Sequence, residues 1–316
     1  MSMLLFGLLF LVFVAILLAL DLGVFHKKDH VIGVSESLRW TGIWIAISLA
    51  FGAAVYFLYD KQLLTSPSGV IGGSEALLEY LTGYLIEKSL SLDNIFVMAA
   101  IFSYFKIPGI YQHRVLFWGI LGAILLRGIF ILGGTALINH FSWLMYVFGV
   151  LILVTAVKML FEKDDDEADL SNNRIVRLCQ KFLPVTHQIQ GHNFTLIQNG
   201  KRFFTPLFIA LAVIETSDVL FAVDSIPAIF GVTTDPFIVF TSNIMAILGL
   251  RSLYFALAAM LNKFDKLKYA IVFILAFVGI KMLIVDFIHI PTVVSLSVII
   301  GSLAIGMLIS LKSPKH

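Results

Sequence analysis

Two apolar stretches of the chain repeat one arrangement of acidic residues. In each stretch, two acids stand six residues apart with a polar residue directly after them, and the second stretch has one more glutamate upstream. The residues are Glu87, Asp93 and Asn94 in the first stretch, and Glu215, Asp218, Asp224 and Ser225 in the second. Ionised groups inside a bilayer are costly unless they are paired or functional. Five acids in two matching sets therefore predict a path for cations through a membrane.

The donor atoms in these stretches limit the choice of cation. All eight histidines lie in connections, at the ends of apolar segments or at the terminus, and Cys179 lies in a long connection. The remaining donors are carboxylates, hydroxyls, backbone carbonyls and the amides of Asn94 and Asn243. Oxygen donors suit Mg²⁺, Ca²⁺ or Mn²⁺ better than Cu⁺ or Zn²⁺. The five acids are thus the candidate metal ligands, and Asn94 and Ser225 are candidate members of the ion path.

The elements that must position these residues are membrane-spanning helices. The 316 residues are 59% hydrophobic and 13% charged, and the mean hydropathy of +0.97 is too high for a soluble domain of this length. We therefore expect an all-α polytopic membrane protein with one transmembrane domain over residues 1–316. Apolar segments of spanning length occur at 3–25, 40–59, 76–104, 115–138, 142–161, 205–230, 237–261, 268–287 and 292–311, which predicts about nine helices.

Basic residues predict the orientation of the chain. Sixteen of the 22 fall in alternate connections between the apolar segments, whereas the opposite connections hold only Lys61. Cytoplasmic connections are enriched in lysine and arginine, so the N-terminus is predicted to lie outside and the C-terminus in the cytoplasm. The five remaining bases lie inside predicted spans: Lys88, Arg127, Lys158, Arg251 and Lys281.

The order of acids and bases indicates an internal repeat. In each half an acidic stretch is followed by an arginine and then a lysine, and the distances from Arg127 to Lys158 and from Arg251 to Lys281 are 31 and 30 residues. Each unit holds three spans, an odd number, so the second copy must enter the bilayer from the opposite side. Inverted repeats are characteristic of transporters that bind substrate near the midplane. The predicted repeats are 76–161 and 205–287, with peripheral helices in 1–60 and 292–316 and a cytoplasmic acidic loop at 163–203.

Helical geometry adds a condition to the cation-path hypothesis. Side chains six residues apart point about 120° away from each other on a regular helix, so the acids of each stretch do not share a face. A break near Asp93 and another near Asp224 would let them converge. Pro227 lacks a backbone N–H and is the visible candidate for the second break.

A structural interpretation competes with transport. Five acids and five bases inside the spans could form a network of ion pairs with no transported ion. Lys158 lies near a span end and is expected to extend its ammonium to the interface. Two roles, charge balancing and gating, remain open for Lys88, Arg127, Arg251 and Lys281. The acidic run within 162–169 is expected to be a solvated tether, with a low-affinity cation antenna as the alternative.

Three long motifs carry a family resemblance. They are Glu87-Lys-Ser-Leu-Ser-Leu-Asp93-Asn94-Ile-Phe-Val, the stretch from Glu215 to Phe230, and Thr233-Thr-Asp235-Pro-Phe-Ile-Val-Phe-Thr-Ser-Asn243. The chain resembles the TerC integral membrane family, especially its Alx-type members, which belong with the LysE-type transporters. The resemblance implies a bacterial inner-membrane exporter of Mn²⁺ that uses the five acids.

The resemblance and the residues together set the functional expectations. We expect Mn²⁺ as transported substrate, protons as the counter-ion, a lipid bilayer as surroundings, no tightly bound cofactor, no nucleic-acid partner and no enzymatic activity. Export of Ca²⁺ or another cation is one alternative. The other is a non-transporting membrane scaffold linked to tellurite or envelope stress resistance. The sequence does not indicate an oligomeric state.

Overall fold

The structure is a computed structural model that describes residues 3–23, 33–66, 69–141, 143–161, 181, 183–186, 188–198, 200–258, 267–288 and 290–312. The acidic run within 162–169 and Cys179 lie outside the described residues, so the tether and antenna interpretations stay predictions.

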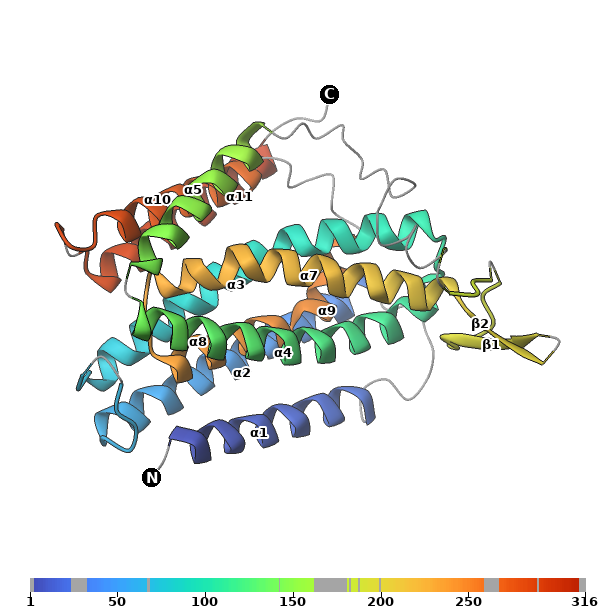
Figure 1. Ribbon diagram of the computed structural model, residues 1–316, viewed down its shortest axis with the longest axis horizontal. Coiled ribbons are helices and arrows are strands. Elements are labelled where there is room, and N and C mark those ends of the chain that lie inside the picture. Colours follow the sequence, from blue (N-terminus) through green and yellow to red (C-terminus); the bar gives the residue numbers. More distant parts are fainter. Residues whose placement is uncertain are drawn as a thin grey trace.

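Long helices make up most of the described chain (Figure 1). Each predicted apolar segment coincides with helical structure, and α2, α3 and α4 begin several residues earlier than their apolar segments. The helices are α1 (Met3–Gly23), α2 (Val34–Asp60), α3 (Gly73–Tyr104), α4 (Gly109–His140), α5 (Leu144–Phe161), α7 (Pro206–Phe230), α8 (Pro236–Leu248), α9 (Leu250–Ala258), α10 (Leu267–Leu283) and α11 (Thr292–Lys312).

The helix surfaces are those of a membrane protein. Among the described residues, α2, α4, α5, α7 and α11 are long and apolar enough to cross a bilayer, and α8 with α9 would add a sixth span as one bent unit. Large apolar side chains face outwards, including Leu125 at 66% exposure and Phe161 at 77%. Water would not favour such a surface, whereas lipid does. The expectation of an all-α polytopic membrane protein is confirmed, while the number nine and the inverted repeats stay predictions.

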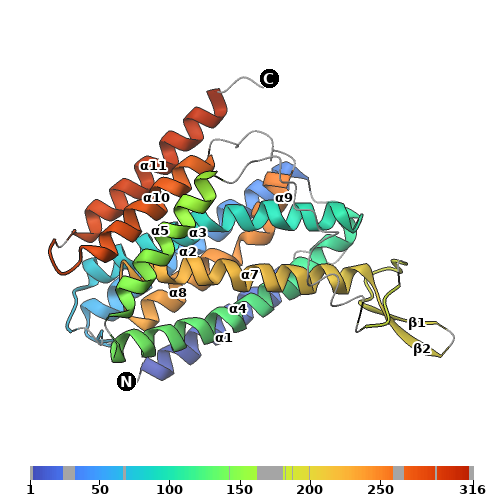
Figure 2. The same ribbon diagram turned by 45° about the horizontal axis from the view of Figure 1, so that its top comes forward.

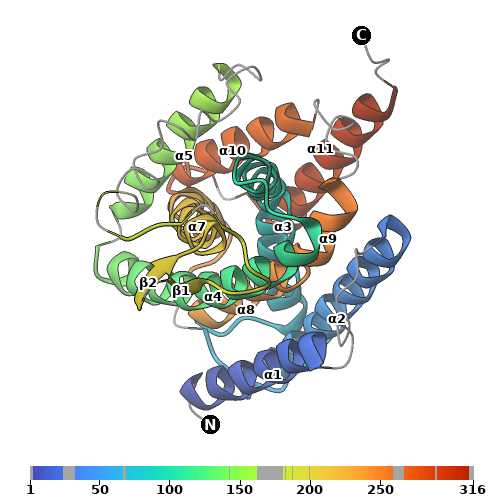
Figure 3. The ribbon, with the colours of Figure 1, turned by 90° about the vertical axis from the view of Figure 1, so that its right-hand side faces the viewer.

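Helices α3 and α7 lie side by side at the centre of the bundle (Figures 2 and 3). Around them, α3 also packs against α8 and α4 packs against α7. Exchanging α3 with α7 and α4 with α8 converts the first of these contacts into the second. The predicted repeat requires this exchange. The packing of α3 against α7 places both acidic stretches in the middle of the molecule.

The helix break lies at a different place from the one predicted. Helices α3 and α7 are each continuous, so the breaks expected near Asp93 and Asp224 are wrong. Pro227 lies in the last turn of α7. Its missing N–H removes only one hydrogen bond there, so the helix accommodates it. Instead, the segment predicted as one helix at 237–261 divides into α8 and α9 with a bend of 40°. Gly249 lies at that break, where a Cβ atom would stand 2.9 Å from Cβ of Trp44 on α2.

Part of the predicted loop at 163–203 forms a hairpin. Strands β1 (Thr195–Gln198) and β2 (Lys201–Phe204) pair antiparallel, with Thr195 opposite Phe204, and extend beyond the start of α7 (Figure 1). Gly200 in the turn has a φ of +76°, which favours glycine. The hairpin was not predicted, although the dipeptide Asn-Gly at 199–200 is a recognised hairpin signal.

A close crossing of α5 and α10 generates a stability prediction. A Cβ atom on Gly279 would lie 2.9 Å from Cγ of Leu153 and 3.1 Å from the carbonyl oxygen of Gly149. We expect Gly279→Leu to destabilise the protein by about 1–3 kcal/mol, because the added side chain overpacks this crossing. Thermal unfolding in detergent measures the change. Gly133→Leu on α4 is the control, since no atom lies within 4 Å of its added Cβ; equal losses in the two variants would contradict the packing argument.

Candidate functional site

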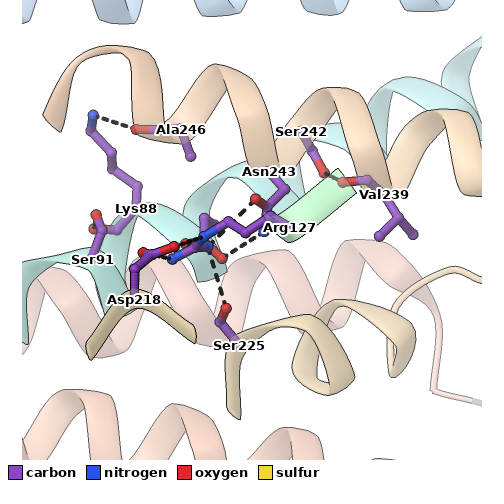
Figure 4. A network of polar contacts seen from close by, with 10 residues as sticks. Lys88, Ser91, Arg127, Asp218, Ser225, Val239, Ser242, Asn243 and Ala246 are labelled. Atoms are coloured by element: carbon purple, nitrogen blue, oxygen red, sulfur yellow. Dashed lines mark hydrogen bonds and ion pairs between the residues drawn. The ribbon is translucent and has the colours of Figure 1, made fainter. Parts of the chain in front are cut away.

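A buried arginine joins the two acidic stretches. Arg127 of α4 is 1% exposed. Its Nη2 donates to Oδ1 of Asp218 at 2.7 Å, and its Nε donates to Oδ2 of the same carboxylate at 3.1 Å. The Nη1 group donates to Oε1 of Glu87 on α3. One guanidinium therefore holds an acid from each predicted repeat (Figure 4).

Two polar residues complete this contact. Asn243 of α8 donates from Nδ2 to Oε2 of Glu87 at 2.9 Å, and its Oδ1 accepts from Nη1 of Arg127 at 3.4 Å. The hydroxyl of Ser225 on α7 accepts from the same Nη1 at 3.5 Å. We call Glu87, Arg127, Asp218, Ser225 and Asn243 the central cluster; it draws on α3, α4, α7 and α8.

The central cluster carries an uncompensated charge when its acids are ionised. Glu87 and Asp218 contribute two negative charges, and Arg127 contributes one positive charge. Glu87 is 1% and Asp218 is 6% exposed, so water screens this charge poorly. The cluster is therefore suited to accept one further positive charge, either a proton or part of the charge of a metal ion.

A small cavity lies beside Asp218, between α3 and α7. Its polar lining consists of Asn94, Ser217 and Asp218, and its apolar lining includes Met98 and Phe221. The centre of a water-sized sphere can move through about 10 Å³ of it, which is room for about one water molecule. Asn94 is buried, and its Oδ1 has no hydrogen-bond partner among the described residues. The cavity thus places an unused amide oxygen near the Asp218 carboxylate.

Glu215 lies one helical turn before Asp218 but outside the central cluster. Its carboxylate occupies space that Gly122 of α4 leaves open, because a Cβ atom there would overlap the carboxyl group. Its Oε2 is buried and has no hydrogen-bond partner among the described residues. Glu215 is therefore a second acid on the same stretch of α7, half-buried, with a buried oxygen available to a ligand.

The five predicted metal ligands are only partly located. Glu87 and Asp218 come together, Glu215 is close to Asp218 along α7, and the side chains of Asp93 and Asp224 lie outside the described part of the chain. Among the described residues, no group of three or more Asp, Glu, His or Cys side chains is arranged to hold a metal ion. The metal-ligand assignment stays a prediction.

The basic residues have separate surroundings. Lys88 points away from the central cluster and donates from Nζ to the carbonyl oxygen of Ala246 at 3.0 Å, in the last turn of α8 (Figure 4). Lys281 donates to Oγ of Ser295 at 3.0 Å, and Arg251 is buried near the start of α9. Lys158 is exposed on α5, and the extension of its ammonium to the membrane interface stays a prediction. Asn243 was an oxygen donor in the sequence but was not assigned to the site, because only the fold shows that α8 meets α3 at Glu87.

Apolar outer surfaces around a buried charged centre define a multi-pass integral membrane protein. The family model described as "Integral membrane protein TerC family" matches residues 72–316. The chain belongs to this family, and the resemblance inferred from its motifs is confirmed.

Relatives extend over nearly the whole chain. An "Uncharacterized membrane protein STKORF319" of Myxococcus xanthus is 49% identical over 97% of this chain and 92% of its own length. Proteins named Alx, each proposed to be a membrane-bound redox modulator, are 47% identical in Salmonella typhi and 46% identical in Escherichia coli strain K12. Each of these two matches covers 95% of this chain and 92% of the relative. No solved structure shows a significant match.

The buried ion pairs predict a strongly asymmetric response to mutation. Arg127→Met would leave two buried carboxylates without their cation, so we expect a loss of about 3–5 kcal/mol in stability. Adding Glu87→Gln and Asp218→Asn removes those charges and should recover much of the loss. Unfolding in detergent measures both effects.

The control for this prediction is Arg114→Met. Arg114 is also on α4, is exposed, and stacks over the ring of Phe194 at 5.4 Å. It should cost about 0.5–1 kcal/mol. A similar cost for the two arginines, or a triple variant less stable than Arg127→Met, would contradict the account of the central cluster.

Proposed function

We propose that the protein exports Mn²⁺ from the cytoplasm through the central cluster and its neighbouring cavity, with protons as the counter-ion. The main observation that supports this proposal is that Arg127 holds acids of both predicted repeats inside the membrane domain, next to a cavity whose polar lining consists of oxygen donors. A site between inverted repeats near the midplane is the arrangement that alternating-access transporters use.

Arg127 acts in this proposal as a tethered cation. In the described arrangement its guanidinium occupies both oxygens of Asp218 and one oxygen of Glu87. A divalent cation that binds these carboxylates competes with the guanidinium, because both draw on the same lone pairs. Arg127 would offset one of the negative charges during the return step, in which protons replace the metal, and would move aside when the metal binds.

Charge balance supports exchange with protons. Glu87, Glu215 and Asp218 together contribute three negative charges against the one positive charge of Arg127. One Mn²⁺ brings the sum for these four side chains to zero, and two protons do the same. Because a net charge in a water-poor site is unfavourable, a site that binds either one Mn²⁺ or two protons is suited to antiport.

The donors around the cavity support a hard or borderline cation. Carboxylates and an amide oxygen suit Mn²⁺, Mg²⁺ and Ca²⁺. Export of Ca²⁺ or another cation is therefore the nearest alternative. The names of the Alx relatives suggest a redox role instead. A thiol–disulfide switch within one chain needs two cysteines, however, and this chain has only Cys179.

Flux into proteoliposomes tests the proposal. We expect Asp218→Asn to lower Mn²⁺ flux by about tenfold or more, because it removes a charged ligand and weakens the hold on Arg127. Asp60→Asn is the control, since Asp60 is exposed at the end of α2. A pH gradient should accelerate flux, and competition by Ca²⁺ would measure selectivity.

Two outcomes would contradict the transport proposal. One is wild-type flux of Mn²⁺ no greater than that of empty liposomes. The other is Asp218→Asn flux equal to that of Asp60→Asn. Retained function in Asp218→Asn, combined with loss of function on removing residues 163–203, would favour the scaffold alternative.

A glycine substitution tests Glu215 without removing its charge. The Cβ atom of Gly122→Ala would overlap the Glu215 carboxylate and force it away. We expect Mn²⁺ flux to fall several-fold while the protein stays folded. Gly119→Ala is the matched control one turn earlier on α4, where the added Cβ makes an ordinary 3.5 Å contact with Ile214. Equal flux in the two variants would exclude a role for the position of Glu215.

A further inference from the structure

A second buried acid lies on α3 outside the central cluster. Glu79 is eight residues before Glu87, about 12 Å along the helix axis. It is 9% exposed, and its Oε2 is buried with no hydrogen-bond partner among the described residues. The sequence comparison of the two acidic stretches did not single it out, because Glu79 precedes the repeated pattern.

The charged and titratable groups around Glu79 come from several elements. They are Glu75 on α3, Tyr59 at the end of α2, Asp235 at the start of α8, and Lys281 on α10. The hydroxyl of Thr233 also lies near the Glu79 carboxylate. These residues surround Glu79 at the end of the bundle where α3 begins, which the basic-residue distribution predicts to be outside the cytoplasm.

The neighbours of Glu79 are largely committed to other partners. The Tyr59 hydroxyl donates to Oδ2 of Asp235 at 2.8 Å. The other oxygen of Asp235 accepts from the backbone N–H groups of Phe237 and Ile238 at 2.9 and 3.2 Å. The ammonium of Lys281 donates to Ser295. Within the described chain, Glu79 has no ion pair, so one carboxylate oxygen is left for a ligand.

The ligand that fits this oxygen is a proton. A divalent metal needs several oxygen donors, and both Asp235 oxygens are already engaged. No group of three acidic, histidine or cysteine side chains suited to a metal occurs among the described residues. A proton needs only one carboxylate oxygen, and protonation removes a buried charge that lacks an ion-pair partner.

One hydroxyl lies between Glu79 and the central cluster. Glu79, Gly83 and Glu87 follow each other at four-residue spacing and so lie along one side of α3. Opposite Gly83 is Ser242 of α8, whose Oγ would lie 2.8 Å from a Cβ atom added to the glycine. Ser242 precedes Asn243, which donates to Glu87. The contact between α3 and α8 thus places the Ser242 hydroxyl between the two acids; it donates to the carbonyl oxygen of Val239 at 3.2 Å, and its oxygen can still accept.

We propose that Glu79 is a proton-binding residue at the outer end of the pathway, distinct from the acids that bind the metal. Its role in supplying the counter-ion rests on the proposed function, whereas proton binding itself does not. Protons arriving from outside would bind Glu79 before the central cluster releases its cation. Lys281 donates to Ser295 and forms no ion pair with Glu79 within the described chain, so protonation of Glu79 breaks no such pair.

Infrared spectroscopy of the purified, metal-free protein over a pH series tests proton binding directly. The C=O stretch of a protonated carboxylic acid should appear at a pH where exposed carboxyl groups are already ionised. We expect the component of this band that belongs to Glu79 to be lost in Glu79→Gln and to return, shifted, in Glu79→Asp, while any component from Glu215 and the central cluster remains. Glu75→Gln is the control one turn earlier on α3, where the side chain is exposed, and it should keep the band.

Flux and binding assays then test the assignment to the pathway. Glu79→Gln should keep Mn²⁺ binding within about twofold of wild type, and its flux should lose most of its acceleration by external acid. A band unchanged in Glu79→Gln would overturn proton binding. A loss of Mn²⁺ binding as large as that of Asp218→Asn would make Glu79 a metal ligand and overturn its distinction from the central cluster.

The two proposals can fail separately. If liposomes that contain the wild-type protein show no Mn²⁺ flux while the infrared band depends on Glu79, the transport proposal fails and proton binding stands. If Mn²⁺ flux depends on Asp218 but its acceleration by acid is equal in Glu79→Gln and Glu75→Gln, transport stands and the role of Glu79 in the pathway is excluded.

Discussion

Arg127 bridges Glu87 and Asp218 in the buried interior, where water cannot compensate an unpaired charge. The packing of the central helices therefore has to preserve this contact. Its guanidinium uses three N–H groups on two carboxylates, and Asn243 closes the arrangement from α8. In a water-poor interior the attraction is strong, but so is the penalty for losing one partner. Helices α3, α4, α7 and α8 must therefore keep relative positions that preserve these hydrogen bonds.

This requirement explains where glycine and polar residues lie around the cluster. Gly122 provides room for Glu215, and Gly83 lets α3 approach Ser242 on α8. Gly249 leaves room for Trp44 and for the Lys88 ammonium, which donates to the Ala246 carbonyl. A bound cation could change this arrangement because it competes for the oxygens that hold the helices together, which couples ligand binding to helix position.

Much of the fold could be predicted from the sequence. The length of an apolar segment and the free-energy cost of a charge inside it depend on that segment alone. Helix positions, the membrane class and the interpretation that acids and bases inside the spans form ion pairs follow from such rules. The position of the helix break could not be predicted: Pro227 lies too close to the end of α7 to divide it, whereas Gly249 lies against Trp44, about 200 residues away in the chain, and spacing within one segment does not reveal such a contact. Asn243 and Glu79 were missed for a related reason, since their roles depend on which helices meet, and spacing within one helix does not reveal that.

The central claim is that Mn²⁺ and the Arg127 guanidinium compete for the same carboxylates. An experimental structure of the protein grown with Mn²⁺, with the metal located by its anomalous scattering, tests this most directly. The account predicts metal density between Glu87 and Asp218, with Arg127 withdrawn from at least one of them. A guanidinium still bound to both carboxylates, with the metal bound elsewhere or absent, would contradict it.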